Sequence, residues 1–228
     1  EAIRNVYTNH LRPAVLRLYD ATEAAFLYSR VESKETAPLL IVGHEGRTAM
    51  VEAERVELES MLVEHGGRAL GTSIGDAWER HRFDASWLDT GNAGPARLAD
   101  AIEVSAFWPS LAPLYHEAMR RIRPLCSRAM GHYSHFYSTG GALYIIFFVE
   151  GSDREDALRR YSLVWQEVME ATMSYGGSIS HHHGIGRARS ALLGRELATS
   201  GVVLAGLKQA LDPKGIFNPG HLALEKRI

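Results

Sequence analysis

The sequence contains Ala142-Leu143-Tyr144-Ile145-Ile146-Phe147-Phe148-Val149, an unbroken apolar and aromatic run that is followed by Glu150-Gly151. Its length and its content of β-branched and aromatic residues predict a buried strand. Apolar residues then keep helical spacing over 158–172, and this pattern stops at Gly176-Gly177. Residues 178–180 resume as a strand, so this half of the chain reads strand, helix, strand.

The first half repeats the same plan. An apolar run at 39–43 leads to Glu45-Gly46, and a helical pattern then extends to Gly66-Gly67. Asp20 followed by Glu23 is a capping-box pattern that opens a short helix. Further strands are predicted at 15–18, 68–70, 102–106 and 133–137, and further helices at 109–130, 187–197 and 202–211.

The repeated pattern predicts an α+β fold. We expect duplicated ferredoxin-like units that share an antiparallel sheet, with helices packed on one face of the sheet and additional C-terminal helices. The segment 84–95 has loop composition and is expected to wrap the surface or cover a site.

Bulk properties narrow the class of protein. The chain has 228 residues, of which 46% are hydrophobic and 23% charged, as in soluble globular proteins. A formal net charge of -2 supplies no basic field, so nucleic acid is not an expected partner. Cys126 is the single cysteine, which excludes an intramolecular disulfide and favours a reducing, cytoplasmic compartment. Because the sequence opens at Glu1 within a helical pattern, we expect it to be part of a longer protein.

Three adjacent histidines give the strongest chemical signal, in the run Ser178-Ile179-Ser180-His181-His182-His183-Gly184-Ile185-Gly186-Arg187. If residues 181–183 continue a strand, alternation places His181 and His183 on one face and His182 on the other. Imidazoles suit acid/base and substrate-orienting roles near neutral pH, although a purely structural cluster stays open. Gly184 and Gly186 allow close backbone approach and a helix N-terminus that faces an anion.

The sequence pattern does not predict a metal centre. All three rings of such a run cannot easily bind one ion, and a further ligand would have to come from elsewhere, such as His132 or His135. The sequence lacks the His-Glu-x-x-His spacing of many zinc sites.

Other candidates have two readings each. Tyr137, at the start of the strongest strand, is either a routine strand tyrosine or a phenolic proton donor and acceptor. Arg17 is either paired with an acid such as Asp20 or contacts a cofactor or an acidic substrate group. Arg80 and Arg82 either clamp a phosphate or lie on a solvated helix face.

Together these motifs resemble a known family. The landmarks appear in family order: Arg17-Leu18-Tyr19-Asp20, Glu45-Gly46, Gly66-Gly67, Glu103-Val104-Ser105-Ala106-Phe107-Trp108, Tyr137, residues 181–186 and Asn218-Pro219. The chain resembles the cap and C-terminal portion of alkyldihydroxyacetonephosphate synthases, also called alkylglycerone-phosphate synthases, within the FAD-linked oxidases. The resemblance implies a cap domain over 1–186 and a helical segment over 187–228 that returns to an FAD-binding domain.

The resemblance also implies roles for individual residues. Tyr137 would be the catalytic acid/base, and His181, His182 and His183 would position substrate and assist proton transfer. FAD would be contacted by Arg17, Gly184, Gly186 and Asn218. Arg82 and Arg80 would bind the substrate phosphate, because the arginine that the family carries before the Glu103 landmark is replaced here by Ser86-Trp87-Leu88-Asp89.

The implied activity is the exchange of the acyl group of acyl-dihydroxyacetone phosphate for a fatty alcohol, with FAD as cofactor and no net redox change. The family's FAD-binding domain would be the partner, and the isolated fragment is expected to be inactive. Peripheral membrane contact and a homodimer stay open. The alternatives are an FAD-dependent 2-hydroxyacid oxidase or dehydrogenase of the glycolate or lactate type and, third, a non-enzymatic ligand-binding module.

Overall fold

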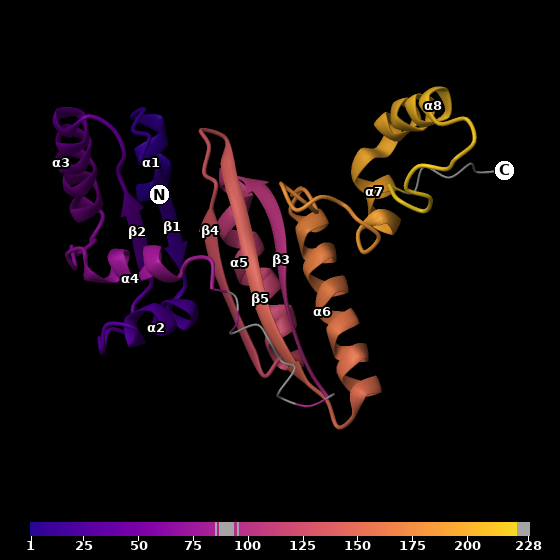
Figure 1. Cartoon of the computed structure of the whole chain (residues 1–228), viewed down its shortest axis with the longest axis horizontal. Coiled ribbons are helices and arrows are strands. Elements are labelled where there is room, and N and C mark those ends of the chain that lie inside the picture. The colour runs from indigo at the N-terminus through magenta and orange to yellow at the C-terminus, as the bar shows by residue number, and fades with distance from the viewer. Residues whose placement is uncertain (85, 87–93, 95, 223–228) are drawn as a thin grey trace.

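A computed structural model describes residues 1–84, 86, 94 and 96–222. Figure 1 shows the arrangement of the helices and strands. In order they are α1 (Ala2–Thr8), β1 (Val15–Tyr19), α2 (Ala21–Ser29), β2 (Leu39–Gly43), α3 (Thr48–Glu64), α4 (Ser73–His81), β3 (Arg97–Phe107), α5 (Trp108–Ile122), β4 (Arg128–Ser134), β5 (Gly140–Glu150), α6 (Arg154–Ser174), α7 (Ser190–Leu197) and α8 (Gly201–Leu211).

The strands form one antiparallel sheet in the order β2-β1-β4-β5-β3, which confirms the predicted α+β class. The register aligns four residues across it: Tyr19 pairs with His132, His132 with Tyr144, and Tyr144 with Glu103. Paired residues project from the same face of a sheet. A row of polar side chains therefore crosses the sheet on one face.

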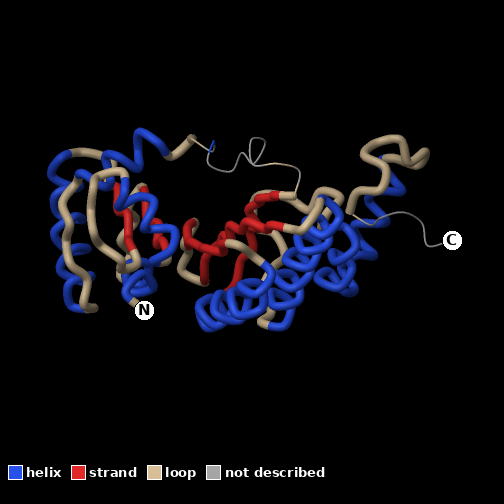
Figure 2. Tube along the Cα trace, turned by 90° about the horizontal axis from the view of Figure 1, so that it is seen from below, coloured by secondary structure: helices blue, strands red, loops and turns tan. Residues whose placement is uncertain are grey.

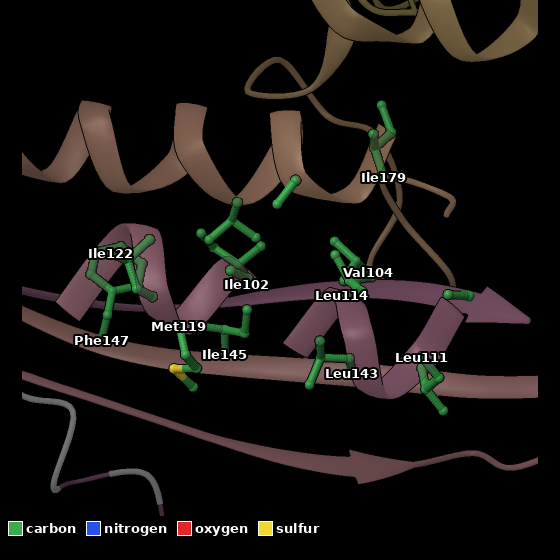
Figure 3. Packing of buried hydrophobic residues seen from close by; sticks show 14 of the residues in the cluster. Ile102, Val104, Leu111, Leu114, Met119, Ile122, Leu143, Ile145, Phe147 and Ile179 are labelled. Atoms are coloured by element: carbon green, nitrogen blue, oxygen red, sulfur yellow. The ribbon is translucent and has the colours of Figure 1, made fainter. Parts of the chain in front are cut away.

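The main core lies on the opposite face, under α5 and α6. Figures 2 and 3 show these helices packed along one side of the β3–β5 region. Alternate residues of the strands supply the packing, since Ile102 and Ile145 are fully buried while their neighbour Glu103 faces the other side. The labelled core residues in Figure 3 are Ile102, Val104, Leu111, Leu114, Met119, Ile122, Leu143, Ile145, Phe147 and Ile179.

Helices α2 and α4 cover the other face of the sheet at its β1–β2 end. A second cluster joins Tyr19 and Ile41 to Trp78, whose Nε1 donates to the Tyr19 hydroxyl at 2.7 Å. Helices therefore lie on both faces of the sheet at its β1–β2 end, whereas helices on only one face were predicted. The reason is that both faces of these two strands carry apolar residues, so each face requires cover.

The second unit follows the predicted duplicated plan more closely than the first. It runs β3, α5, β4, β5, α6 and then a single bridge between Ser105 and Ser178. The first unit runs β1, α2, β2, α3, and the strand predicted at 68–70 is not formed. The strand predicted at 178–180 is reduced to that one bridge.

Several predicted boundaries were wrong, and the strand predicted at 102–106 spans Arg97–Phe107. The helix predicted to reach Met130 ends at Ile122 and gives way to a 3-10 turn, because Pro124 has no N–H for a continuing helix. The strand predicted at 133–137 begins earlier, at Arg128, and ends at Ser134. Most of the predicted loop at 84–95 lies outside the described residues, and so do Trp87, Leu88 and Asp89.

The C-terminal helices differ in burial. Helix α7 packs against the main core through Leu192, and its Leu193 is 6% exposed, whereas α8 has no buried residue. The predicted boundary at 186 stays a prediction. In the part of the chain described here, no helix combines the length and the apolar character needed to cross a bilayer.

Phe147→Ala is expected to lower the free energy of unfolding by about 3–5 kcal/mol, because the fully buried ring packs against Tyr161 in the main core. Phe83→Ala is the control, since that ring is 86% exposed, and its effect should stay within about 0.5 kcal/mol. Denaturant unfolding measures both. Equal losses for the two variants would contradict the assignment of Phe147 to the core.

Candidate active site

The site is built around Glu103, a carboxylate in the middle of β3 with no exposed surface. It accepts hydrogen bonds from three consecutive backbone N–H groups, those of His181 and His182 at 3.0 Å and that of His183 at 3.4 Å. Burial acts to raise the pKa of Glu103, but these donors and the adjacent His182 imidazole lower it below its usual value. Glu103 is therefore ionised at neutral pH.

The histidine segment is a tight bend and not a strand, which corrects the predicted alternation of its side chains. Wrapping three successive N–H groups around one carboxylate turns the backbone, so the two-residue period of a strand is lost. The rings of His181 and His182 meet, with 2.9 Å between their Nδ1 atoms. Both Nδ1 atoms also face Glu103 Oε1, at 3.4 Å from His181 and 3.0 Å from His182.

The imidazoles of His181 and His182 are each hydrogen-bonded to a tyrosine hydroxyl. The Tyr137 hydroxyl lies 3.0 Å from His181 Nε2, and the Tyr144 hydroxyl lies 2.7 Å from His182 Nε2. We assign the hydrogens so that every bond has one donor: Tyr144 donates to His182 Nε2, His182 Nδ1 donates to His181 Nδ1, and His181 Nε2 donates to Tyr137. The result is a continuous chain of hydrogen bonds from Tyr144 through both imidazoles to Tyr137.

The two ends of this chain differ in exposure. Tyr137 is 47% exposed and Tyr144 only 9%. Burial, followed by the negative charge of Glu103, raises the pKa of Tyr144, which holds it as a phenol. Burial likewise lowers the pKa values of His135 and His183, so these rings stay neutral beside the chain. Proton exchange with a ligand is open at Tyr137.

A second network lies next to Tyr144 on the same sheet face. The His132 ring stacks on Tyr144 with 4.6 Å between centroids. Its Nδ1 donates to the Glu23 carboxylate at 2.9 Å, so its Nε2 accepts from Arg17 at 2.7 Å. Arg17 is thus held by His132 and not by Asp20, which caps α2 and also accepts from the Tyr115 hydroxyl and the Gly131 N–H. The capping box is half formed, because the Glu23 side chain turns to His132.

Two cavities flank the polar row. One, of about 580 Å³, is lined by Tyr137, His181 and the backbone around Gly140 and Gly177. The other, of about 320 Å³, contains Arg17, His132 and Arg82. Arg82 packs on the Trp78 ring, with its guanidinium carbon 5.6 Å from the ring centre. Arg80 is exposed on α4 and does not line this cavity.

A family model for the C-terminal domain of FAD-linked oxidases matches residues 1–222. The chain belongs to this FAD-linked oxidase family. It is 29% identical over 81% of its length to an alkyldihydroxyacetonephosphate synthase of Trypanosoma brucei brucei, covering 31% of that protein. It is 27% identical over 96% of its length to an uncharacterized FAD-linked oxidoreductase, YgcU, of Escherichia coli strain K12, covering 48% of that protein.

A solved alkyldihydroxyacetonephosphate synthase structure has the same fold, with a TM-score of 0.66 and 20% identity over 96% of this chain and 41% of that one. This FAD-linked oxidase domain thus spans less than half the length of the relatives it matches. The family establishes a flavoprotein enzyme class, and the reaction and its substrates are argued as a proposal below.

The structure brings most of the sequence-predicted site residues together. His181, His182 and His183 meet on Glu103, and Tyr137 is hydrogen-bonded to His181. Arg17 joins them through His132 and Tyr144. Gly184 and Gly186 follow the cluster directly, with φ values of 78° and 54° that favour glycine. Asn218 lies in the bend after α8, a segment that Figure 1 shows next to α7 and α8 and away from the sheet. The catalytic and cofactor roles of these residues stay predictions.

Sequence reasoning missed Tyr144, His132 as an Arg17 ligand, Arg189 and the role of Glu103. Arg189, which is 5% exposed, donates to the carbonyl oxygens of Gly184 at 2.6 Å and Glu103 at 3.1 Å. Its guanidinium lies over the Trp165 ring, and burial lowers its pKa. A single acid between the apolar residues Ile102 and Val104 was a signal for Glu103, since a buried charge requires partners.

Arg189→Met should release the histidine bend, because the bend loses the guanidinium that ties Gly184 to β3. Charge-assisted hydrogen bonds of this kind are worth about 1.5–3 kcal/mol, so amide hydrogen exchange over 181–186 should accelerate about 10- to 100-fold. Arg187→Met, at an exposed neighbouring position, is the control and should leave exchange unchanged. Similar exchange in both variants would show that Arg189 does not hold the bend.

Proposed function

We propose that this domain supplies the acid/base and anion-binding residues of an FAD-dependent enzyme of the alkyldihydroxyacetonephosphate synthase type. The reaction exchanges the acyl group of acyl-dihydroxyacetone phosphate for a fatty alcohol. The observation that carries the proposal is the hydrogen-bonded chain Tyr137–His181–His182–Tyr144, anchored on the buried Glu103. The similarity to synthases over most of this chain supports it.

The proton balance of the exchange suits this chain. A carboxylate leaves and an alcohol oxygen takes its place, so one proton is given to the leaving group and one is removed from the alcohol. Tyr137 is exposed to ligand and gives its hydroxyl proton to the carboxylate, while His181 Nε2 donates to the phenolate that forms. The phenolate then accepts the alcohol proton. Positioned acid/base groups of this kind contribute about 10²–10⁴-fold to rates.

The residues present fit a flavin with polar acceptor groups. Arg17 Nε is buried and has no hydrogen-bond partner among the described residues, so it can donate to an acceptor atom of a bound group. Arg17, Gly184, Gly186 and Asn218 are the residues that we assign to FAD contact. When bound, FAD supplies a ring system that accepts an electron pair.

The cavity of about 320 Å³ suits an anionic lipid-like substrate. Arg17 and Arg82 both line it. A guanidinium group can donate two parallel hydrogen bonds to two oxygens of one phosphate. Its apolar wall includes Phe26, Trp78 and Met130, against which an aliphatic chain can pack. We assign the phosphate to Arg82, with Arg80 in a peripheral role in the same recognition, while Arg17 on the same cavity stays assigned to FAD contact.

Partner and compartment are part of the same proposal. We propose an FAD-binding domain as the partner, since the chain belongs to the FAD-linked oxidase family and spans 31% of one synthase relative and 48% of another family member. The lone Cys126, with the pKa of its thiol raised by burial, suits a reducing cytoplasmic setting.

The purified flavoprotein should convert acyl-dihydroxyacetone phosphate and a fatty alcohol to the alkyl product and a fatty acid, while its flavin absorbance returns to the oxidised form after each turnover. Product mass spectrometry and the flavin spectrum under anaerobic conditions are the measurements. Lasting anaerobic bleaching by lactate or glycolate, with no alkyl exchange, would replace this proposal with a 2-hydroxyacid oxidase.

Tyr137→Phe should lower turnover by about 10²–10⁴-fold and leave flavin content unchanged, because only the proton-carrying hydroxyl is removed. Tyr133→Phe is a matched control from the preceding strand, since Tyr133 packs against Tyr115 on the core face. Steady-state kinetics with flavin quantitation compares them. Near-normal turnover of Tyr137→Phe would remove this phenol from the mechanism.

A further inference from the structure

We propose that Glu103, His181 and His182 form a binding site for one divalent transition-metal ion, with Zn²⁺ as the probe. The sequence analysis assigned no metal, because strand alternation separated the histidine rings. The bend removes that objection. It brings one oxygen of Glu103 and one nitrogen of each imidazole within 4.8 Å of one another.

The three ligand atoms have the spacing of a coordination face. Glu103 Oε1 lies 3.0 Å from His182 Nδ1 and 3.4 Å from His181 Nδ1, and the two Nδ1 atoms are 2.9 Å apart. Metal bonds of about 2.0–2.1 Å give ligand-to-ligand distances of about 2.9 Å at right angles and about 3.4 Å in a tetrahedron. A cation can therefore contact all three atoms with little movement of the side chains.

Outer contacts orient the ligands in the way that metal sites require. The Nε2 atoms of His181 and His182 face the hydroxyls of Tyr137 and Tyr144, which can accept the ring N–H when each Nδ1 binds a cation. The three backbone N–H bonds fix the carboxylate. Two imidazoles and one carboxylate on a single face are a ligand set that zinc and iron accept, with the remaining positions open.

The charge balance favours a cation at this place. Glu103 is fully buried and ionised, and among the described residues it forms no ion pair with Lys or Arg. The groups that contact the carboxylate are N–H dipoles and imidazoles, and the nearby Arg189 donates only to the backbone carbonyl oxygen of Glu103. The His181 and His182 side chains are 25% and 40% exposed, which leaves a path for a cation and its water ligands.

The cation and the shared proton exclude each other, because both occupy the gap between the two Nδ1 atoms. Binding of the cation frees both Nδ1 lone pairs for the metal and places hydrogens on both Nε2 atoms. Cation binding at this site does not depend on the proposed reaction. Its readout is spectroscopic, so its failure is distinguishable from failure of the proposed function.

Titration of the purified metal-free protein with Co²⁺ as a spectroscopic probe, and with Zn²⁺ by calorimetry, should give one ion per chain at neutral pH. His181→Gln and His182→Gln should each weaken binding by at least about 10- to 100-fold. His183→Gln is the matched control from the same bend, because its ring is not among the three ligands, and it should retain the affinity of the unaltered protein.

X-ray absorption of the zinc-loaded, unaltered protein provides a second measurement that does not depend on variants folding. It should show two imidazoles and oxygen ligands at about 2.0–2.1 Å. No binding at about 1 mM Zn²⁺, binding that survives both ligand substitutions, or a spectrum without imidazole scattering would each overturn the proposal.

Discussion

The buried carboxylate of Glu103 is the constraint on which the site depends. Removing a carboxylate from water costs several kcal/mol unless donors replace the lost hydration. Here the replacements are the N–H groups of residues 181–183, which follow Glu103 by almost eighty positions in the sequence. If the bend moved away, the Glu103 carboxylate would lose its hydrogen-bond donors while still lying against an apolar sheet. The position of three imidazoles is thereby tied to one strand residue.

Rigid elements then set the tyrosines around those imidazoles. Tyr144 is fixed by pairing between Glu103 and His132 in the sheet, and Tyr137 by the turn that its N–H closes onto the Gly140 carbonyl at 2.7 Å. Gly140 permits the close approach of β3 to this turn, since a Cβ there would lie 2.1 Å from the Ala106 carbonyl oxygen. Groups held by sheet register and a tight turn pay little ordering cost when a ligand arrives.

The sequence predicted the regular elements better than the site. Apolar runs at 39–43 and 142–149 and the Asp20 cap carry local signals, and all three were found. The boundary of β4 was missed because Gly131 and His132 interrupt its apolar pattern. The convergence of His181 and His182 has no local signal, since it follows from a hydrogen-bond demand on a distant strand. Arg189 likewise acquires its role only when the bend lies above β3.

Alternate residues of the strands face the hydrophobic core and the candidate active site. In β3, Ile102 and Val104 face the core and Glu103, between them, faces the site. In β5, Ile145 faces the core and the preceding Tyr144 faces the site. Among the described residues no cationic side chain contacts the Glu103 carboxylate directly, because Arg189 donates to the backbone carbonyl oxygen of Glu103. The side-chain contacts of the carboxylate therefore come from the histidine bend, where we propose that the gap between two Nδ1 atoms accepts either a proton or a cation. With a cation in the gap the two imidazoles act as ligands, and with a proton there they remain part of the hydrogen-bonded chain that ends at Tyr137.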